Sequence, residues 1–304
     1  MNQKYELSGR AGNIWPIGLP LGAVLSIILS IIYAYIMVYN PFIYFNLFIF
    51  VGFLIGIFFI QSLVVNIAKC RSTNATRIYG VLIGVFSLYA NWSTFLYVIL
   101  QSYDFEMSLV EILSNPIQVV QLMSIIAEDG YYSIFGIDVS GIVLWIFWII
   151  EAIGIVVAGI FGGQHVLHEE VFCEDCNRWA EDINLDLRLS LENKEAVDAA
   201  IERNIGALAE APTTKFEYPH LKVIMHHCSQ CDNFSTINLD KVRREFKKDK
   251  YVEKSEDYTD VFVISNEEHL AFKKAKKQAI KQDDLNEPQS DDDLGTGEVK
   301  PAGM

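Results

Sequence analysis

Four of the five cysteines in this sequence form two Cys-x2-Cys pairs, a spacing that is typical of metal sites. The pairs are FCEDC, with Cys173 and Cys176, and HHCSQC, with Cys228 and Cys231. Each pair can wrap a tight turn that points both sulfurs inward, and two pairs together supply the four thiolates of a tetrahedral zinc site. Because four protein ligands leave no position for water, we expect the zinc to be structural rather than catalytic.

Two other interpretations of the cysteines stay open. A redox Cys-x-x-Cys normally opens a helix in a thioredoxin-like setting, whereas Cys173 closely follows an apolar stretch and Cys228 follows an extended one. Inert thiols are the second alternative. Four histidines could replace a cysteine, although four thiolates already complete a site: His165, His168, His226 and His227.

One carboxylate, Glu151, stands inside the apolar run WIFWIIEAIGIV. An ionisable group at membrane depth is costly and is a functional hypothesis by default. Counting along the apolar runs places Asn91 at a similar depth, where its amide can hydrogen-bond Glu151 and make it a buried structural acid. A proton or ion path is the alternative. Helical spacing puts Glu151 on one side with mostly small residues, so we expect it to face protein: Gly154, Ile155, Ala158 and Gly162.

Four apolar stretches are long enough to cross a bilayer as helices, which takes roughly 20 residues each. They cover residues 17–38, 42–66, 78–100 and 141–161, so residues 1–163 are predicted to form a four-helix transmembrane bundle. The second connection carries Lys69, Arg71 and Arg77, whereas the first and third have no Lys or Arg. The positive-inside rule therefore predicts a multi-pass protein of the inner or plasma membrane, with the N-terminus and the C-terminal domain in the cytoplasm.

The third connection, residues 101–140, is acidic and is predicted to be extracytoplasmic. Within it, Asn115, Pro116 and Gly130 mark the start and the end of a helix that we expect to cover the bundle as a lid. Two small-residue spacings, Gly52-x3-Gly56 and Gly80-x3-Gly84, are typical of close helix contacts. They favour packing within one chain and leave a homo-oligomer open.

Residues 164–282 are predicted to form a small α+β cytosolic domain that resembles a zinc ribbon. Residues 193–211 predict a helix inserted between the knuckles, and the runs LKVIM, FSTINL and DVFVIS predict strands. A capping box, Ser265-x2-Glu268, opens a basic helix over residues 266–282. Residues 283–304 have too few apolar side chains to fold and predict a disordered acidic tail.

Charge is divided unevenly along the chain. Residues 1–163 hold five Lys/Arg and eight Asp/Glu, and the remainder holds 19 and 30, for a formal net charge of −14. An acidic soluble half argues against nucleic acid as a partner, and no phosphate loop, HExxH or GxSxG motif names an enzyme. We expect a membrane protein that anchors a structural-zinc domain binding a protein partner on the cytosolic side. A proton or small-solute conduit centred on Glu151 is the alternative, and a membrane-bound metal-dependent enzyme ranks third.

Overall fold

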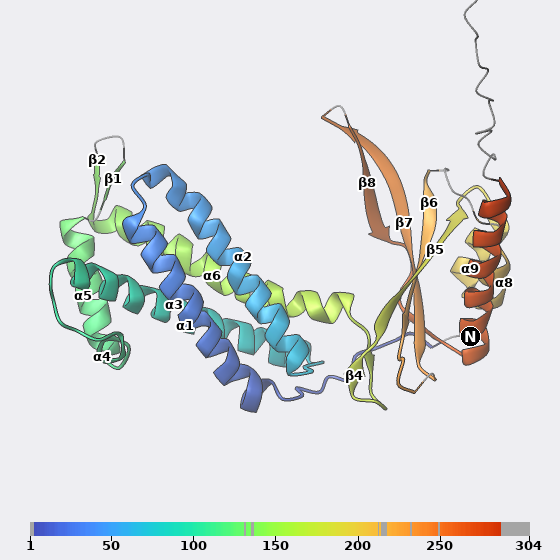
Figure 1. Cartoon of the computed structure of the whole chain (residues 1–304), viewed down its shortest axis with the longest axis horizontal. Coiled ribbons are helices and arrows are strands. Elements are labelled where there is room, and N and C mark those ends of the chain that lie inside the picture. Colours follow the sequence, from blue (N-terminus) through green and yellow to red (C-terminus); the bar gives the residue numbers. More distant parts are fainter. Residues whose placement is uncertain are drawn as a thin grey trace, which may run out of the picture. The chain divides into compact units, whose positions relative to one another are not determined.

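The computed structural model describes residues 3–286, except 131, 135–136, 212, 214–217, 232 and 249. The chain divides into two compact units: Glu6–Ala180 forms one, and Met1–Tyr5 with Glu181–Met304 forms the other. The elements of both are drawn in Figure 1. The predicted domain bounds at residues 163 and 282 stay predictions.

The Glu6–Ala180 unit is built on long helices. They are α1 (Leu19–Tyr39), which continues a short π-helical turn η1 (Ile14–Gly18), then α2 (Asn46–Ile67), α3 (Thr73–Ser102) and α6 (Gly141–Glu169). These four are long and apolar enough to cross a membrane. Each of α1 and α6 packs against both α2 and α3, so α1 and α6 lie diagonally across the bundle (Figure 1).

Local signals explain where these helices begin and end. Asn40 ends α1, because its Oδ1 accepts from the Phe42 N–H and its Nδ2 donates to Asn46 at the start of α2. The 3-10 turn η2 (Ile43–Phe45) fills the short connection. Ser72 caps α3 by accepting a hydrogen bond from the Ala75 N–H at 3.3 Å.

Glycines let α3 and α6 approach backbone to backbone. A Cβ added to Gly80 would lie 2.9 Å from the carbonyl oxygen of Gly159, and one added to Gly84 would lie 2.8 Å from the Cα of Val156. Gly52, by contrast, has open space around it. The Gly80-x3-Gly84 spacing therefore serves packing within the chain.

The segment between α3 and α6 is folded. It contains α4 (Leu109–Leu113), α5 (Pro116–Asp129) and a hairpin of β1 (Tyr132–Ile134) and β2 (Ile137–Val139). The α5 helix has the predicted Asn115 cap and stops before Gly130. Its buried Val119 and Met123 join a cluster with Leu144, so α5 packs on α3 and α6 as expected of a lid.

The second unit has a five-stranded antiparallel sheet in the order β5-β6-β7-β8, with β9 also paired to β7. The strands are β5 (Glu181–Ser190), β6 (His220–His227), β7 (Ser235–Lys247), β8 (Lys250–Asp257) and β9 (Phe262–Ile264). Three helices, α7 (Lys194–Glu202), α8 (Ile205–Glu210) and α9 (Asn266–Asn286), cover one face (Figure 1). Alternate β5 and β6 residues such as Leu187 and Val223 form the core with Phe272 of α9.

Two details of the predicted secondary structure need correction. The single helix expected over residues 193–211 is two helices, because Arg203 adopts a left-handed conformation with φ 59° and Asn204 caps α8. The predicted FSTINL strand continues to Lys247 and returns as β8, which was not predicted. The second unit is thus an α+β fold whose sheet extends beyond the predicted ribbon strands.

Residues near the N-terminus belong to this second unit. The Val263 N–H donates to the Gln3 carbonyl at 2.9 Å, and the Tyr5 N–H donates to the Val261 carbonyl at 2.8 Å. Lys4 adds an ion pair of 2.9 Å with Asp260. The first residues therefore extend the sheet beside β9.

Candidate metal centre

The first cysteine pair lies on a minimal hairpin. Strands β3 (Phe172–Cys173) and β4 (Arg178–Trp179) pair antiparallel, with Cys173 opposite Arg178. Asn177 has a positive φ of 50°, which closes the turn that holds Cys176. We call residues 171–180 the first knuckle.

The second pair follows the end of β6. His227 of β6 pairs with Ser235 of β7, so the segment between them is a closed hairpin loop. The Cys228 N–H donates to the Phe234 carbonyl at 2.9 Å, which turns the chain just after the strand. Cys228 is buried, and Cys231 is partly exposed near the tip of this loop.

The structure brings all four predicted cysteines together. The sulfurs of Cys173, Cys176, Cys228 and Cys231 all lie within 4.8 Å of one another, close enough to hold a metal ion. In a tetrahedral thiolate site with metal–sulfur bonds of about 2.3 Å, the sulfurs are about 3.8 Å apart. A small contraction would therefore complete the coordination, and four soft donors suit a thiophilic metal.

The four histidines considered as alternative ligands have other contacts. His226 Nδ1 lies 2.5 Å from Asp182 Oδ1. His227 Nδ1 lies 2.8 Å from Ser235 Oγ, and its ring stacks on that of His269. In the helix α6, His165 lies against the Phe58 ring and His168 beside Glu169.

Arg71 holds the first knuckle against the α2–α3 connection, a role that the sequence analysis missed. Its guanidinium lies 4.1 Å from the centre of the Phe172 ring, and its Nε is 2.9 Å from Glu174. Its Nη1 also donates to the Lys69 carbonyl at 2.8 Å. The sequence alone showed Arg71 only as one of three positive charges, and no local pattern links it to residues a hundred positions away.

Two further contacts strengthen this attachment. The Trp179 indole N–H donates to the Asn66 carbonyl at 2.9 Å, at the end of α2. The Lys69 ammonium donates to the Asn177 carbonyl in the turn of the first knuckle. Half of the candidate metal ligands are therefore positioned by the end of the helical bundle.

Glu151 lies in the interior of the bundle, as a second candidate site. Its Oε1 accepts hydrogen bonds from Asn91 Nδ2 of α3 at 3.0 Å and from the Tyr33 hydroxyl of α1 at 3.2 Å. Because α1 and α6 are diagonal, the bond to Tyr33 crosses the bundle. Tyr89, which lies two residues before Asn91 in α3, donates instead to the Leu113 carbonyl at 2.8 Å.

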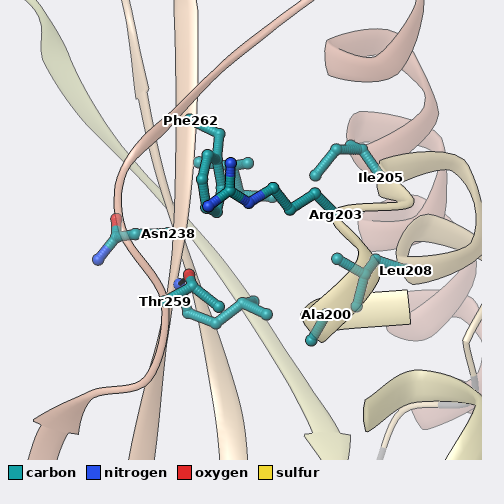
Figure 2. A pocket seen from close by; sticks show the side chains of 9 residues that line it. Ala200, Arg203, Ile205, Leu208, Asn238, Thr259 and Phe262 are labelled. Carbon is teal, nitrogen blue, oxygen red and sulfur yellow. Dashed lines mark hydrogen bonds between the residues drawn. The ribbon is translucent and has the colours of Figure 1, made fainter. Parts of the chain in front are cut away.

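A small pocket lies in the second unit between the helices and the sheet. Figure 2 shows Arg203 and Leu208 on one side and Asn238, Thr259 and Phe262 on the other. It encloses about 10 Å³, which is room for roughly one water molecule. This pocket is too small for an organic substrate.

Comparison with known proteins adds no assignment to these sites. No family model, curated protein or solved structure matches the chain.

Proposed function

We propose that this chain is a multi-pass integral membrane protein whose four-helix bundle anchors a zinc-stabilised cytosolic domain, and that this domain binds a protein partner. The observation that carries the proposal is the four-cysteine cluster in a chain with four apolar helices of membrane-spanning length. Membrane insertion, the identity of the metal and the partner are each testable.

The distribution of side chains on α1 supports insertion in a lipid bilayer. One face exposes Val24, Ile28 and Ile32, each more than half accessible, whereas the opposite face buries Ser26 and Ser30. A water-soluble bundle has the reverse arrangement, with apolar side chains inside. Small and polar residues at helix contacts, with large apolar residues outside, are typical of membrane bundles.

The donor set favours zinc in a structural role. Four thiolates form the commonest closed zinc site, and the two hairpin knuckles resemble those of a zinc ribbon. A cytosolic side, where thiols stay reduced, agrees with metal binding in place of disulfides. The positive charges Lys69, Arg71 and Arg77 favour this side for the α2–α3 connection, to which the first knuckle is attached.

A protein partner is the best use that we find for the second unit. The described pocket between its helices and its sheet holds no substrate-sized volume, and the acidic charge of the chain disfavours nucleic acid. A membrane-bound metal enzyme would need an open ligand position that four thiolates do not leave. That third candidate would return if the bound metal were shown to carry a water ligand.

Metal content of the purified full-length protein tests the proposal. We expect about one zinc per chain in detergent, protection of four thiols from alkylation, and a lower unfolding temperature after chelation. Replacing Cys173 and Cys228 by serine should abolish zinc binding. Cys70→Ser is the matched control and should keep the metal; equal zinc content in all three proteins would refute the site.

A conduit centred on Glu151 is the second candidate, because an ionisable group among four apolar helices is a functional hypothesis by default, although the hydrogen bond from Asn91 also fits a buried structural acid. Flux of protons or small solutes into vesicles containing the protein is the measurement. Glu151→Gln should abolish flux while the protein still assembles. An unaltered flux in this variant removes the conduit.

A further inference from the structure

The interior of the helical bundle is lined with polar groups on two neighbouring helices. Helix α1 contributes the buried Ser26 and Ser30, and α3 contributes the buried Ser87 and Asn91. Buried polar groups need hydrogen-bond partners, above all where the surrounding medium offers none. Buried polar groups that lack a hydrogen-bond partner would therefore indicate a place where the bundle can bind a ligand.

Two contacts define how α1 and α3 lie against each other. The Tyr79 hydroxyl donates to the Gly18 carbonyl, and the Ser87 hydroxyl donates to Ser26 Oγ, each at 2.9 Å. The residues of each pair are separated by 61 positions. The two helices therefore run in parallel with a constant offset.

The same offset brings Ser30 opposite Asn91, one helical turn further along. Ser30 and Asn91 are 0% and 4% exposed. Within the described part of the chain, Ser30 Oγ and Asn91 Oδ1 have no hydrogen-bond partner. The amide nitrogen of Asn91 is engaged by Glu151, as is the Tyr33 hydroxyl three residues after Ser30. Ser30 Oγ and Asn91 Oδ1, which receive no hydrogen bond, thus lie at about the same depth in the bundle as the Glu151 carboxylate.

No basic side chain at this depth can neutralise Glu151, because residues 17–38, 42–66, 78–100 and 141–161 contain no Lys or Arg. A carboxylate away from water must be protonated or bound to a cation. Carboxylate, amide and hydroxyl oxygens are the ligands that hard cations prefer. One carboxylate balances one positive charge.

We propose that Glu151, Asn91, Ser30 and Tyr33 form a binding site for one hard monovalent cation inside the bundle, with Na⁺ as the probe. Glu151 supplies the charge, and the oxygens of Asn91 and Ser30 complete the coordination. The inference uses the carboxylate of the conduit candidate, but it requires binding and no transport. It is also independent of the zinc proposal, because none of these residues belongs to the cysteine cluster.

Thermal unfolding of the full chain in detergent tests the site, with NaCl replaced by choline chloride at constant ionic strength. Na⁺ should raise the unfolding temperature and the effect should saturate, because a ligand that binds only the folded state stabilises it. Glu151→Gln should remove the Na⁺ effect, and Ser30→Ala should raise the Na⁺ concentration for half the effect several-fold. Ser62→Ala is the control, because Ser62 Oγ bonds only the Phe58 and Gly162 carbonyls.

Three outcomes would overturn the inference. The first is equal stability of the wild type in Na⁺ and choline, and the second is a full Na⁺ effect in Ser30→Ala. The third is a stability that responds to pH and not to Na⁺, which would identify Glu151 as a protonated acid. Should Glu151→Gln fail to fold, Ser30→Ala against Ser62→Ala still decides the question. Na⁺ binding without flux would keep this site and remove the conduit alone.

Discussion

Arg71 is one of the residues that join the first knuckle to the helical bundle. Its side chain is only 5% exposed, whereas that of Glu174 is 39% exposed, so solvent screens the ion pair mainly from the Glu174 side. A guanidinium suits this place because it can stack on the Phe172 ring while its N–H groups bond a carboxylate and a carbonyl. The ammonium of a lysine offers a point charge without the planar face.

We predict that Arg71→Ala lowers the free energy of unfolding by about 1–3 kcal/mol, because it removes a buried side chain together with its stacking on Phe172 and its hydrogen bond to the Lys69 carbonyl. The variant should also release its metal to a chelator faster than the wild type, since the first knuckle loses its attachment. Arg71→Lys should lie between the wild type and Arg71→Ala, both in stability and in the rate of metal release. Thermal unfolding and the rate of zinc release measure both effects.

The exposed Arg77, near the start of α3, provides the control. Arg77→Ala should leave stability and metal release unchanged. If Arg71→Ala and Arg77→Ala behaved alike, the contacts of Arg71 would contribute nothing beyond its charge.

For single residues, the sequence predicted those whose chemistry depends on residue type and spacing. The four cysteines are recognisable because each pair is local, and Asn91 could be placed opposite Glu151 because depth in a spanning helix follows from counting. In the structure these two side chains are hydrogen-bonded. Arg71 and the bond from Tyr33 were not predicted, because both depend on which distant segments meet.

Among the elements, α3 and α6 make a close backbone contact through Gly80 and Gly159. We predict that Gly80→Ala separates the helices and destabilises the bundle by about 1–3 kcal/mol, because a methyl group there collides with backbone that cannot rotate away. Gly52→Ala should be neutral or slightly stabilising, because nothing lies within 4 Å of the added carbon. Unfolding temperatures of the two variants in one detergent give the comparison, and equal losses would contradict the packing argument.

Elements with strong local signals were predictable from the sequence, and others were not. The cap at Asn115 and the stop at Gly130 define α5 by short-range hydrogen bonding and backbone conformation. Strand β5 also has a readable signal in the alternation of Ile183, Leu185, Leu187 and Leu189, which the sequence analysis overlooked. Strand β8 has none, because its residues are exposed along its whole length and only pairing with β7 keeps it extended.

For the molecule as a whole, the pairing of residues 3–5 with residues 261–263 fixes both segments in one unit. An even number of membrane crossings, as proposed, returns the chain to the side where it started, so the two segments can meet. No sequence pattern predicts this contact, because the paired segments are short and stand at opposite ends of the described chain.

We predict that deleting residues 1–5 accelerates hydrogen exchange at the Val263 amide by at least an order of magnitude, because that N–H loses its acceptor, the Gln3 carbonyl. Hydrogen-exchange mass spectrometry of the peptide covering β9 is the measurement. Lys4→Ala removes only the ion pair with Asp260 and should leave this exchange nearly unchanged. Unchanged protection after the deletion would show that the N-terminal residues add nothing to the sheet.

The same pairing sets the order of events during biosynthesis. Residues 3–5 leave the ribosome before their partners in β9, which follow only after the bundle has been made, on the order of tens of seconds later at ordinary translation rates. Throughout that interval the first segment has no strand to pair with. The sheet can therefore be completed only after residues 261–263 have been made, and an insertion next to residues 3–5 would place its linker directly beside β9.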